Sequence, residues 1–154
     1  MKKILTQLFL ALAFFTSTAQ QINFVEYDLE NGLHVILHQD NSAPVVSATL
    51  QFHVGSKDED DGLKGFAHLF EHMLGKETKN MDSGQWGKIY SARGGSGNAS
   101  TSVDLTNYYV TVPSNSLKLA LWRYSEIMLH PIIEQETIDI QREAVKEEKR
   151  LRYN

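Results

Sequence analysis

The apolar residues of this chain follow a period of two in segments between Ile22 and Val54 and a helical period from Gly65 onward. Alternation is typical of strands with one buried face, whereas apolar residues at three- and four-residue steps are typical of amphipathic helices. The alternating period returns at Ala99, and the helical period returns at Ser116. This order of strands, helices, strands and helices predicts an α+β domain in which helices cover an antiparallel sheet.

Turn residues divide these segments into individual elements. Asn31-Gly32 between two alternating segments is typical of a β-hairpin, and Pro131 is expected to end a helix. We interpret Gly94-Gly95-Ser96-Gly97 as a turn between a helix and a second hairpin. The expected strands are 22–29, 33–37, 45–54, 99–104 and 108–113, and helices are expected from about 65 to 74, 85 to 92, 116 to 129 and 135 to 152.

The first residues are typical of a secretory signal peptide. Lys2 and Lys3 precede an uncharged apolar run of about 12 residues, shorter than the roughly 20 needed to cross a bilayer as a helix. Small residues at Ser17 and Ala19 suit cleavage after Ala19. We therefore expect residues 1–19 to be removed and residues 20–154 to be exported to the periplasm or the cell exterior, with no membrane span.

Composition limits the chemistry that the chain can perform. It has 15 Lys and Arg against 19 Asp and Glu, so no basic surplus favours binding to nucleic acid. It has no cysteine, which excludes disulfides, thiolate zinc sites and cysteine nucleophiles. Any strongly bound metal ion must therefore be held by histidine, aspartate or glutamate.

The string His68-Leu69-Phe70-Glu71-His72 is the strongest candidate for such a site. Residues four apart on a helix share one face, so both imidazoles can reach one ion, with Glu71 beside them. The simpler alternative is a solvated helix face that carries two histidines by chance. Apolar neighbours such as Phe66 and Phe70 favour a metal site, because imidazoles and a carboxylate among them would be costly without a partner.

A catalytic zinc ion needs a third protein ligand. The other histidines are poor candidates, because each is expected on a strand or at a helix end without a second ligand nearby: His34, His38, His53 and His130. The last helix offers Glu143, Glu147 and Glu148. Glu148 falls on the least polar stripe, whereas the other two have charged neighbours, so Glu148 is the better third ligand.

These residues resemble the pitrilysin/insulinase family of zinc peptidases, which includes the mitochondrial processing peptidase. The string HLFEH resembles the inverted HxxEH zinc motif. The segment that leads to the motif in the family is resembled by Val54-Gly55-Ser56, Glu59 and Gly65-Phe66-Ala67. The family's glycine turn and edge strand are resembled by Gly94 to Ser96, Asn98 to Thr101, Thr106 to Tyr109 and Val112-Pro113. The helix that supplies the distal glutamate in the family is resembled by Arg142 with Val145 to Glu148. The resemblance covers nearly all of the chain after residue 19.

The resemblance implies a zinc metallopeptidase that hydrolyses extended peptides or unfolded proteins. His68, His72 and Glu148 would bind one zinc ion, and Glu71 would be the general base that takes a proton from zinc-bound water. Asn98 and Ala99 would pair with the backbone of the substrate. The fold implied is part of the N-terminal domain of such a peptidase.

The resemblance also has departures and one alternative. Family members contain paired homologous domains, so we expect this chain to lack a C-terminal half or to act with a homologous partner subunit. The family often has glutamate before Arg142, where this chain has Gln141; the change concerns an auxiliary acidic contact rather than the metal ligands. The alternative function is a non-catalytic or truncated homologue that binds zinc or peptide within a larger assembly.

Overall fold

The structure is a computed structural model that describes residues 21–153, so the expected signal peptide at residues 1–19 lies outside the described residues. The chain divides into two compact units, one ending at Ala43 and the other beginning at Pro44.

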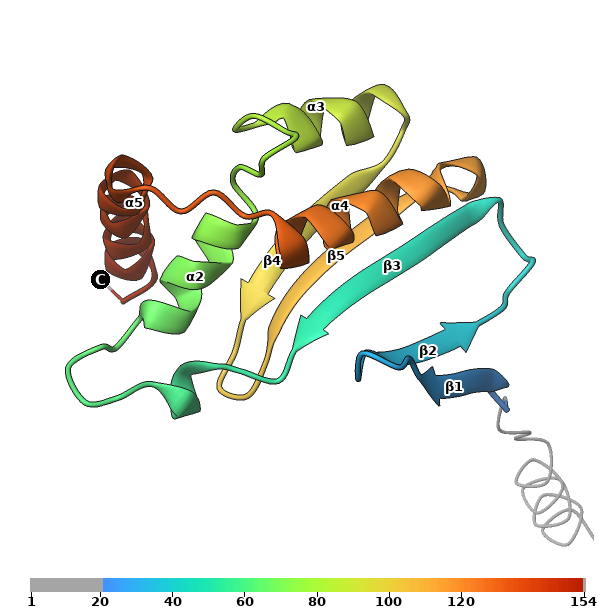
Figure 1. The fold of residues 1–154 in the computed structure, drawn as a ribbon, viewed down its shortest axis with the longest axis horizontal. Helices are drawn as coiled ribbons and strands as arrows, with labels where there is room; N and C mark the ends of the chain where they lie inside the picture. Colours follow the sequence, from blue (N-terminus) through green and yellow to red (C-terminus); the bar gives the residue numbers. More distant parts are fainter. Residues whose placement is uncertain (1–20, 154) are drawn as a thin grey trace, which may run out of the picture. The chain divides into compact units, whose positions relative to one another are not determined.

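The first unit contains the predicted β-hairpin. Strands β1 (Phe24–Asp28) and β2 (His34–His38) pair in antiparallel fashion (Figure 1). In the turn between them, the side chain of Asn31 accepts a hydrogen bond of 3.2 Å from the backbone N–H of Leu33. The Asn-Gly signal therefore predicted this connection correctly.

The second unit is built on an antiparallel sheet of three strands, in the order β3 (Val45–Phe52), β5 (Thr106–Pro113) and β4 (Ser96–Thr101). Side chains of β5 alternate in burial: Thr106, Tyr108, Val110 and Val112 are buried, and Tyr109 and Thr111 are exposed. The sheet therefore buries one face, as the alternating sequence predicts. Strand β4 lies at an edge, with one side unpaired by β5.

Helices cover the buried face of this sheet. Helix α4 (Leu117–Leu129) lies across it, and the hydroxyl of Tyr124 donates a 2.6 Å hydrogen bond to the backbone oxygen of Ala48 in β3 (Figure 1). Helix α3 (Gln85–Ala92) adds Trp86 and Tyr90. The core consists of Leu50, Met81, Trp86, Tyr90, Tyr108, Val110, Val112, Ala120, Tyr124 and Ile127. These findings confirm the predicted α+β class with an antiparallel sheet covered by helices.

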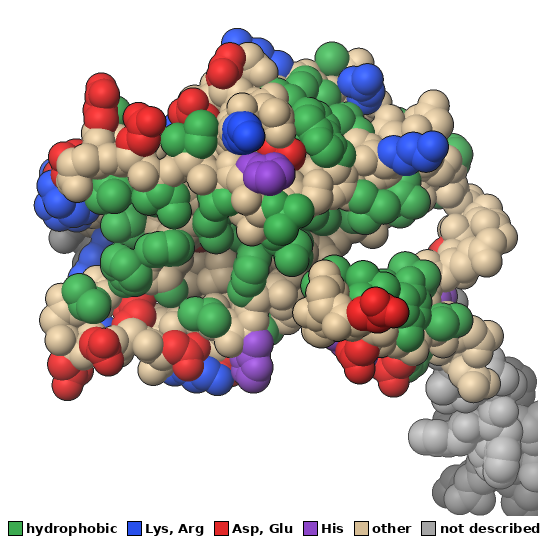
Figure 2. Space-filling view, viewed as in Figure 1, with side chains coloured by type: hydrophobic (Ala, Val, Ile, Leu, Met, Phe, Trp, Pro, Cys, Tyr) green, Lys and Arg blue, Asp and Glu red, His purple; other side chains and the backbone are tan. Residues whose placement is uncertain are grey.

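The outer side of α4 remains partly apolar. Figure 2 shows hydrophobic side chains on this face of the molecule, and Leu121 and Leu129 of α4 are exposed. Helix α4 therefore packs on the sheet with its inner side alone. None of the helices in residues 21–153 is long and apolar enough to cross a membrane.

Strand β4 begins earlier than the sequence predicted. The expected strand was 99–104, but the observed one is Ser96–Thr101, and Ser96 and Gly97 belong to the strand rather than to the turn. A Cβ atom on Gly97 would lie 2.8 Å from the backbone oxygen of Tyr109, so only glycine allows β4 and β5 to approach this closely. A glycine selected for close packing was thus misinterpreted as a turn residue.

Helix α2 (Phe66–Leu74) is the short helix that carries the histidine pair, and its N-terminus is held by a carboxylate from the preceding loop. Glu59 follows the short 3-10 helix η1 (Ser56–Asp58) and accepts hydrogen bonds of 2.9 Å from the backbone N–H groups of Gly65 and Ala67. These donors have no partner within the helix, and a negative charge at a helix N-terminus is favourable. Glu59 therefore caps α2 from six residues upstream.

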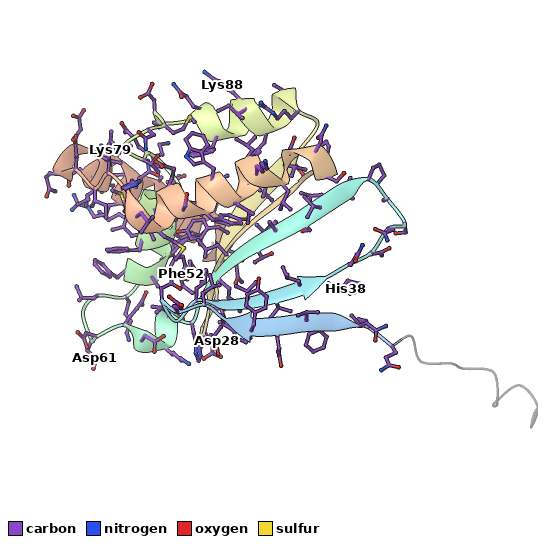
Figure 3. The ribbon with its side chains drawn as sticks, turned by 45° about the vertical axis from the view of Figure 1, so that its right-hand side comes forward. Asp28, His38, Phe52, Asp61, Lys79 and Lys88 are labelled. Atoms are coloured by element: carbon purple, nitrogen blue, oxygen red, sulfur yellow. The ribbon has the colours of Figure 1, made fainter. Side chains whose placement is uncertain are left out.

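The segment after α2 is tied to the chain around Pro131. The N–H of Lys79 (Figure 3) donates to the backbone oxygen of His130 (2.9 Å), and that of Ile132 donates to Glu77 (3.2 Å). Residues 130–134 lead directly into α5 (Gln135–Tyr153), which packs against α2 at one end of the sheet (Figure 1). The position of α5 is therefore linked to that of α2.

A second short 3-10 helix, η2 (Ser114–Ser116), precedes α4.

A buried carboxylate of α4 also holds the segment that follows α2. Glu126 of α4 is 3% exposed, and the side-chain N–H groups of Asn80 donate to both of its oxygens at 3.0 and 3.1 Å. Burial by itself would raise the pKa of Glu126, but hydrogen bonding from Asn80 and Thr78 and the charge of His130 together lower the pKa below its usual value.

Replacing Glu59 by Ala should lower the free energy of unfolding by about 1–2 kcal/mol, because two N–H donors of α2 lose their acceptor. Urea unfolding measures the change. Asp60→Ala, in the same loop, is the matched control and should change stability by less than about 0.5 kcal/mol. Equal losses in the two variants would contradict the capping role of Glu59.

Glu126 should contribute an acid-sensitive part of the stability. Because its pKa is lowered in the folded chain, its contribution is present above the unfolded pKa and is lost as the pH falls through the folded pKa. Urea unfolding at neutral and acid pH should therefore show a smaller loss of stability on acidification for Glu126→Gln than for the unsubstituted chain. The same loss in both chains would refute this assignment.

Candidate metal centre

Two helices bring together three side chains that could hold a metal ion. His68 and His72 lie one turn apart on α2, and Glu148 lies on α5. The Nε2 atoms of the two histidines are 3.2 Å apart. One oxygen of Glu148 lies 3.4 Å from Nε2 of His68, and the other lies 3.6 Å from Nε2 of His72. Each residue can thus offer one ligand atom to a common point.

These separations fit a tetrahedral zinc ion. Zinc bonds to imidazole nitrogen and carboxylate oxygen measure about 2.0–2.1 Å, so neighbouring ligand atoms in a tetrahedron lie about 3.3 Å apart. The two imidazole nitrogens lie 3.2 Å apart, close to this value, and each lies 3.4 or 3.6 Å from a different oxygen of Glu148. One ligand atom from each residue can be chosen so that all three lie within 4.8 Å of one another. Two nitrogens and one oxygen also form the donor set of a catalytic zinc ion, which keeps its fourth position open. The residues present therefore fit zinc.

The amide of Gln141 fixes the orientation of one imidazole. Its Oε1 lies 3.3 Å from Nδ1 of His72, and the Gln141 side chain is buried. An amide oxygen only accepts hydrogen bonds, so Nδ1 of His72 must be the donor, and the lone pair remains on Nε2. The position at which the family often has glutamate is thus filled here by a neutral acceptor that supports the nitrogen suited to a metal.

Glu71 lies beside this group but is held by different partners. Its side chain is 8% exposed, and its Oε2 accepts a 2.5 Å hydrogen bond from the hydroxyl of Thr101 in β4. Its backbone oxygen accepts a 2.9 Å bond from the hydroxyl of Tyr108 in β5. Burial, followed by the negative charge of Glu71, raises the pKa of Tyr108, which keeps this donor protonated.

The other candidate carboxylates of α5 point elsewhere. Glu143 pairs with Lys146 (2.7 Å), and Glu147 pairs with Arg150 (2.6 Å), both at the surface of the helix. The remaining histidines of residues 21–153 also lie outside the group. His34 contacts Asp28, His38 contacts the backbone of Asn23, His53 is exposed, and His130 is the C-cap of α4. Glu148 is therefore the carboxylate that joins the histidine pair.

A cavity of about 810 Å³ opens over these side chains, and one of its walls is the edge strand β4. Asn98 and Ala99 line it together with His68, Glu71, His72 and Glu148. The backbone N–H of Ala99 donates 2.9 Å to the side-chain oxygen of its neighbour Asn98. The two residues of β4 singled out from the sequence thus lie in the same cavity as the histidine pair.

Sequence reasoning missed the contact between Thr101 and Glu71 and the capping role of Glu59. Thr101 and Glu59 were noted only within segments that resemble a family signature. Their partners come from a different strand or from beyond a loop, so no local periodicity indicates them. One signal was available for Glu59, since α2 begins at glycines and apolar residues without a Ser, Thr, Asp or Asn cap of its own.

Comparison with known proteins agrees with this geometry. Residues 34–151 match the family model described as Insulinase (Peptidase family M16). The zinc protease PqqE of Helicobacter pylori is 35% identical over 125 residues, which are 80% of this chain and 28% of that protein. Human insulin-degrading enzyme is 34% identical over 122 residues, which are 79% of this chain and 12% of that enzyme.

A solved structure shows the same fold. The crystal structure of the first half of the periplasmic protease PqqL from Escherichia coli superposes with a TM-score of 0.77 at 27% identity, covering 89% of this chain and 31% of that one. The chain thus spans less than a third of the length of each of these proteins. The family match nevertheless extends over the whole sheet of the second unit, over α2 and over α5 as far as Leu151. The chain belongs to the insulinase family of peptidases.

Proposed function

We propose that this chain carries the zinc site of a metallopeptidase that hydrolyses peptide bonds in extended peptides. The observation that carries the proposal is the convergence of one nitrogen each from His68 and His72 and the carboxylate of Glu148, from which one ligand atom per residue lies within 4.8 Å of the others. Two imidazoles and one carboxylate form a donor set typical of catalytic zinc. Membership of a family of zinc peptidases supports the same conclusion.

In this proposal the three residues hold one zinc ion. Zinc, when bound, supplies an electrophile that polarises the scissile carbonyl and makes water more acidic. Glu71 lies on α2 with the two histidines, but its carboxylate is hydrogen-bonded to Thr101. It therefore remains separate from the three proposed zinc ligands and can accept the proton of the attacking water. One carboxylate therefore serves as a ligand and the other as the general base.

We also propose that a substrate peptide adds to β4 as a further strand. The edge of β4 borders the cavity, and the N–H of Ala99 donates to the side chain of Asn98. A peptide carbonyl could replace that side chain without breaking a bond between strands. Backbone pairing of this kind gives affinity with little dependence on sequence, which suits peptides or unfolded proteins as substrates.

Export of the protein is part of the proposal. It is supported by the two lysines and short apolar run at the start of the sequence, which are typical of a signal peptide. The similarity to a protease described as periplasmic supports it further. Cell fractionation, with mass spectrometry of the mature N-terminus, tests cleavage after Ala19.

The first test concerns the third ligand. Glu148→Ala should weaken zinc binding by more than the roughly 10–100-fold typical of losing a supporting group, because it removes a direct ligand. Its neighbour Glu147 pairs with Arg150 instead, so Glu147→Ala is the matched control and should leave the affinity unchanged. Competition with a chromogenic chelator measures both. Equal affinities in the two variants would exclude Glu148 as a ligand.

The second test concerns the base. Glu71→Gln should lower zinc-dependent hydrolysis of a quenched fluorescent peptide by about 10²–10⁴-fold, because the neutral amide cannot accept the proton. Bound zinc, measured by elemental analysis, should remain at one ion per chain. Hydrolysis at the original rate would rule out Glu71 as the base. Zinc bound without any turnover in the unsubstituted protein would instead favour a homologue that binds zinc without catalysis.

A further inference from the structure

We propose that Thr101 is a positioning residue for Glu71. The hydroxyl of Thr101, the last residue of β4, lies 2.5 Å from Oε2 of Glu71, which is 8% exposed. This contact joins the sheet to the helix that carries the histidine pair. The inference rests on the proposed role of Glu71 as the base, and it adds the group that determines where the base points.

A neighbouring hydroxyl, that of Thr106, is engaged by a different acceptor. Thr106, paired with Thr101 across the two strands, donates its one hydroxyl hydrogen to the backbone oxygen of Val54 (3.0 Å). Its oxygen lies 3.4 Å from that of Thr101. The hydroxyl of Thr101 donates to Oε2 of Glu71, and the carboxylate oxygen is the acceptor. Thr106, already engaged, does not compete for that role.

The backbone around Thr101 is held firmly enough to orient a second side chain. The turn after it is closed by a 2.8 Å bond from the N–H of Ser102 to the oxygen of Leu105, and Ser102 accepts a 3.0 Å bond from Ser56. A Cβ atom on Gly55 would lie 2.4 Å from the backbone oxygen of Val103, so the loop before α2 packs tightly on this turn. Thr101 is also β-branched, which restricts its side-chain rotamers.

Glu71, by contrast, has a flexible side chain with no other anchor for its carboxylate. Among residues 21–153, the structure shows one hydrogen bond to the Glu71 carboxylate, and it comes from Thr101. The hydrogen bond from Thr101 to Oε2 leaves Oε1 for the reacting water. It also keeps the Glu71 carboxylate apart from the three proposed zinc ligands. A displacement of a reacting group by about 1 Å can cost roughly 100-fold in rate. Thr101 therefore acts on catalysis through Glu71.

The test compares Thr101→Val, which keeps the branched shape and removes the hydroxyl, with Thr101→Ser, which keeps the hydroxyl. The first readout is independent of activity. In chains labelled with ¹³C at glutamate, NMR should show a shifted Glu71 carboxyl resonance in Thr101→Val and a return toward its original position in Thr101→Ser. An unchanged resonance in Thr101→Val would overturn the hydrogen bond.

The second readout is hydrolysis of the fluorescent peptide by the zinc-loaded proteins. Thr101→Val should lower kcat about 10–100-fold with KM within about twofold, and Thr101→Ser should recover most of the loss. Zinc affinity and the urea midpoint should match those of the unsubstituted chain. In the Glu71→Gln background, Thr101→Val should cause no further loss, because the residue that it positions is absent.

The outcomes separate this inference from the function on which it rests. A fall in rate that Thr101→Ser does not recover, or that is as large in the Glu71→Gln background, would overturn the positioning role. A fall explained by lost zinc or lost stability would also overturn it. If the unsubstituted protein shows no zinc-dependent hydrolysis while the Glu71 resonance responds as expected, the proposed function fails, and the contact between Thr101 and Glu71 stands.

Discussion

The candidate site depends on the placement of one short helix. Helix α2 supplies His68, Glu71 and His72, and a helix of nine residues is not stable by itself in water. It is held at its N-terminus by Glu59, along its length by the hydroxyl of Tyr108, and beyond its C-terminus by the segment that leads into α5. These contacts bring the α2 histidines within reach of Glu148. The arrangement of the histidine pair and Glu148 thus comes from tertiary contacts around α2 rather than from the helix itself.

The sheet does more than support α2. Its edge strand β4 supplies the wall of the cavity, and the residue at its end, Thr101, contacts Glu71. The proposed substrate strand and the proposed base therefore share one element. A peptide that pairs with β4 would be placed in register with the carboxylate that Thr101 holds. In the proposed function, this arrangement would link recognition through the backbone to the position of the reacting bond without demanding a particular substrate sequence.

Local patterns predicted the parts of the structure that depend on local rules. The four-residue spacing of the histidines and the stripe that singles out Glu148 are helical periodicities, so both could be read from the sequence. The α+β class followed from the change of period at Gly65. The strand boundary at Ser96 and the partners of Glu59 and Thr101 were not predicted, because they depend on contacts across a loop or between different elements, which no helical or strand period indicates. Gly97 shows the difference, since close packing against Tyr109 rather than a turn explains it.

The central claim is that two imidazoles from α2 and one carboxylate from α5 bind a single zinc ion. X-ray absorption spectroscopy of the zinc-loaded chain measures the ligands directly. We expect nitrogen and oxygen ligands at about 2.0–2.1 Å, with multiple scattering from two imidazole rings and a coordination number of four. Scattering from one imidazole or none, or a shell of six oxygens, would contradict it.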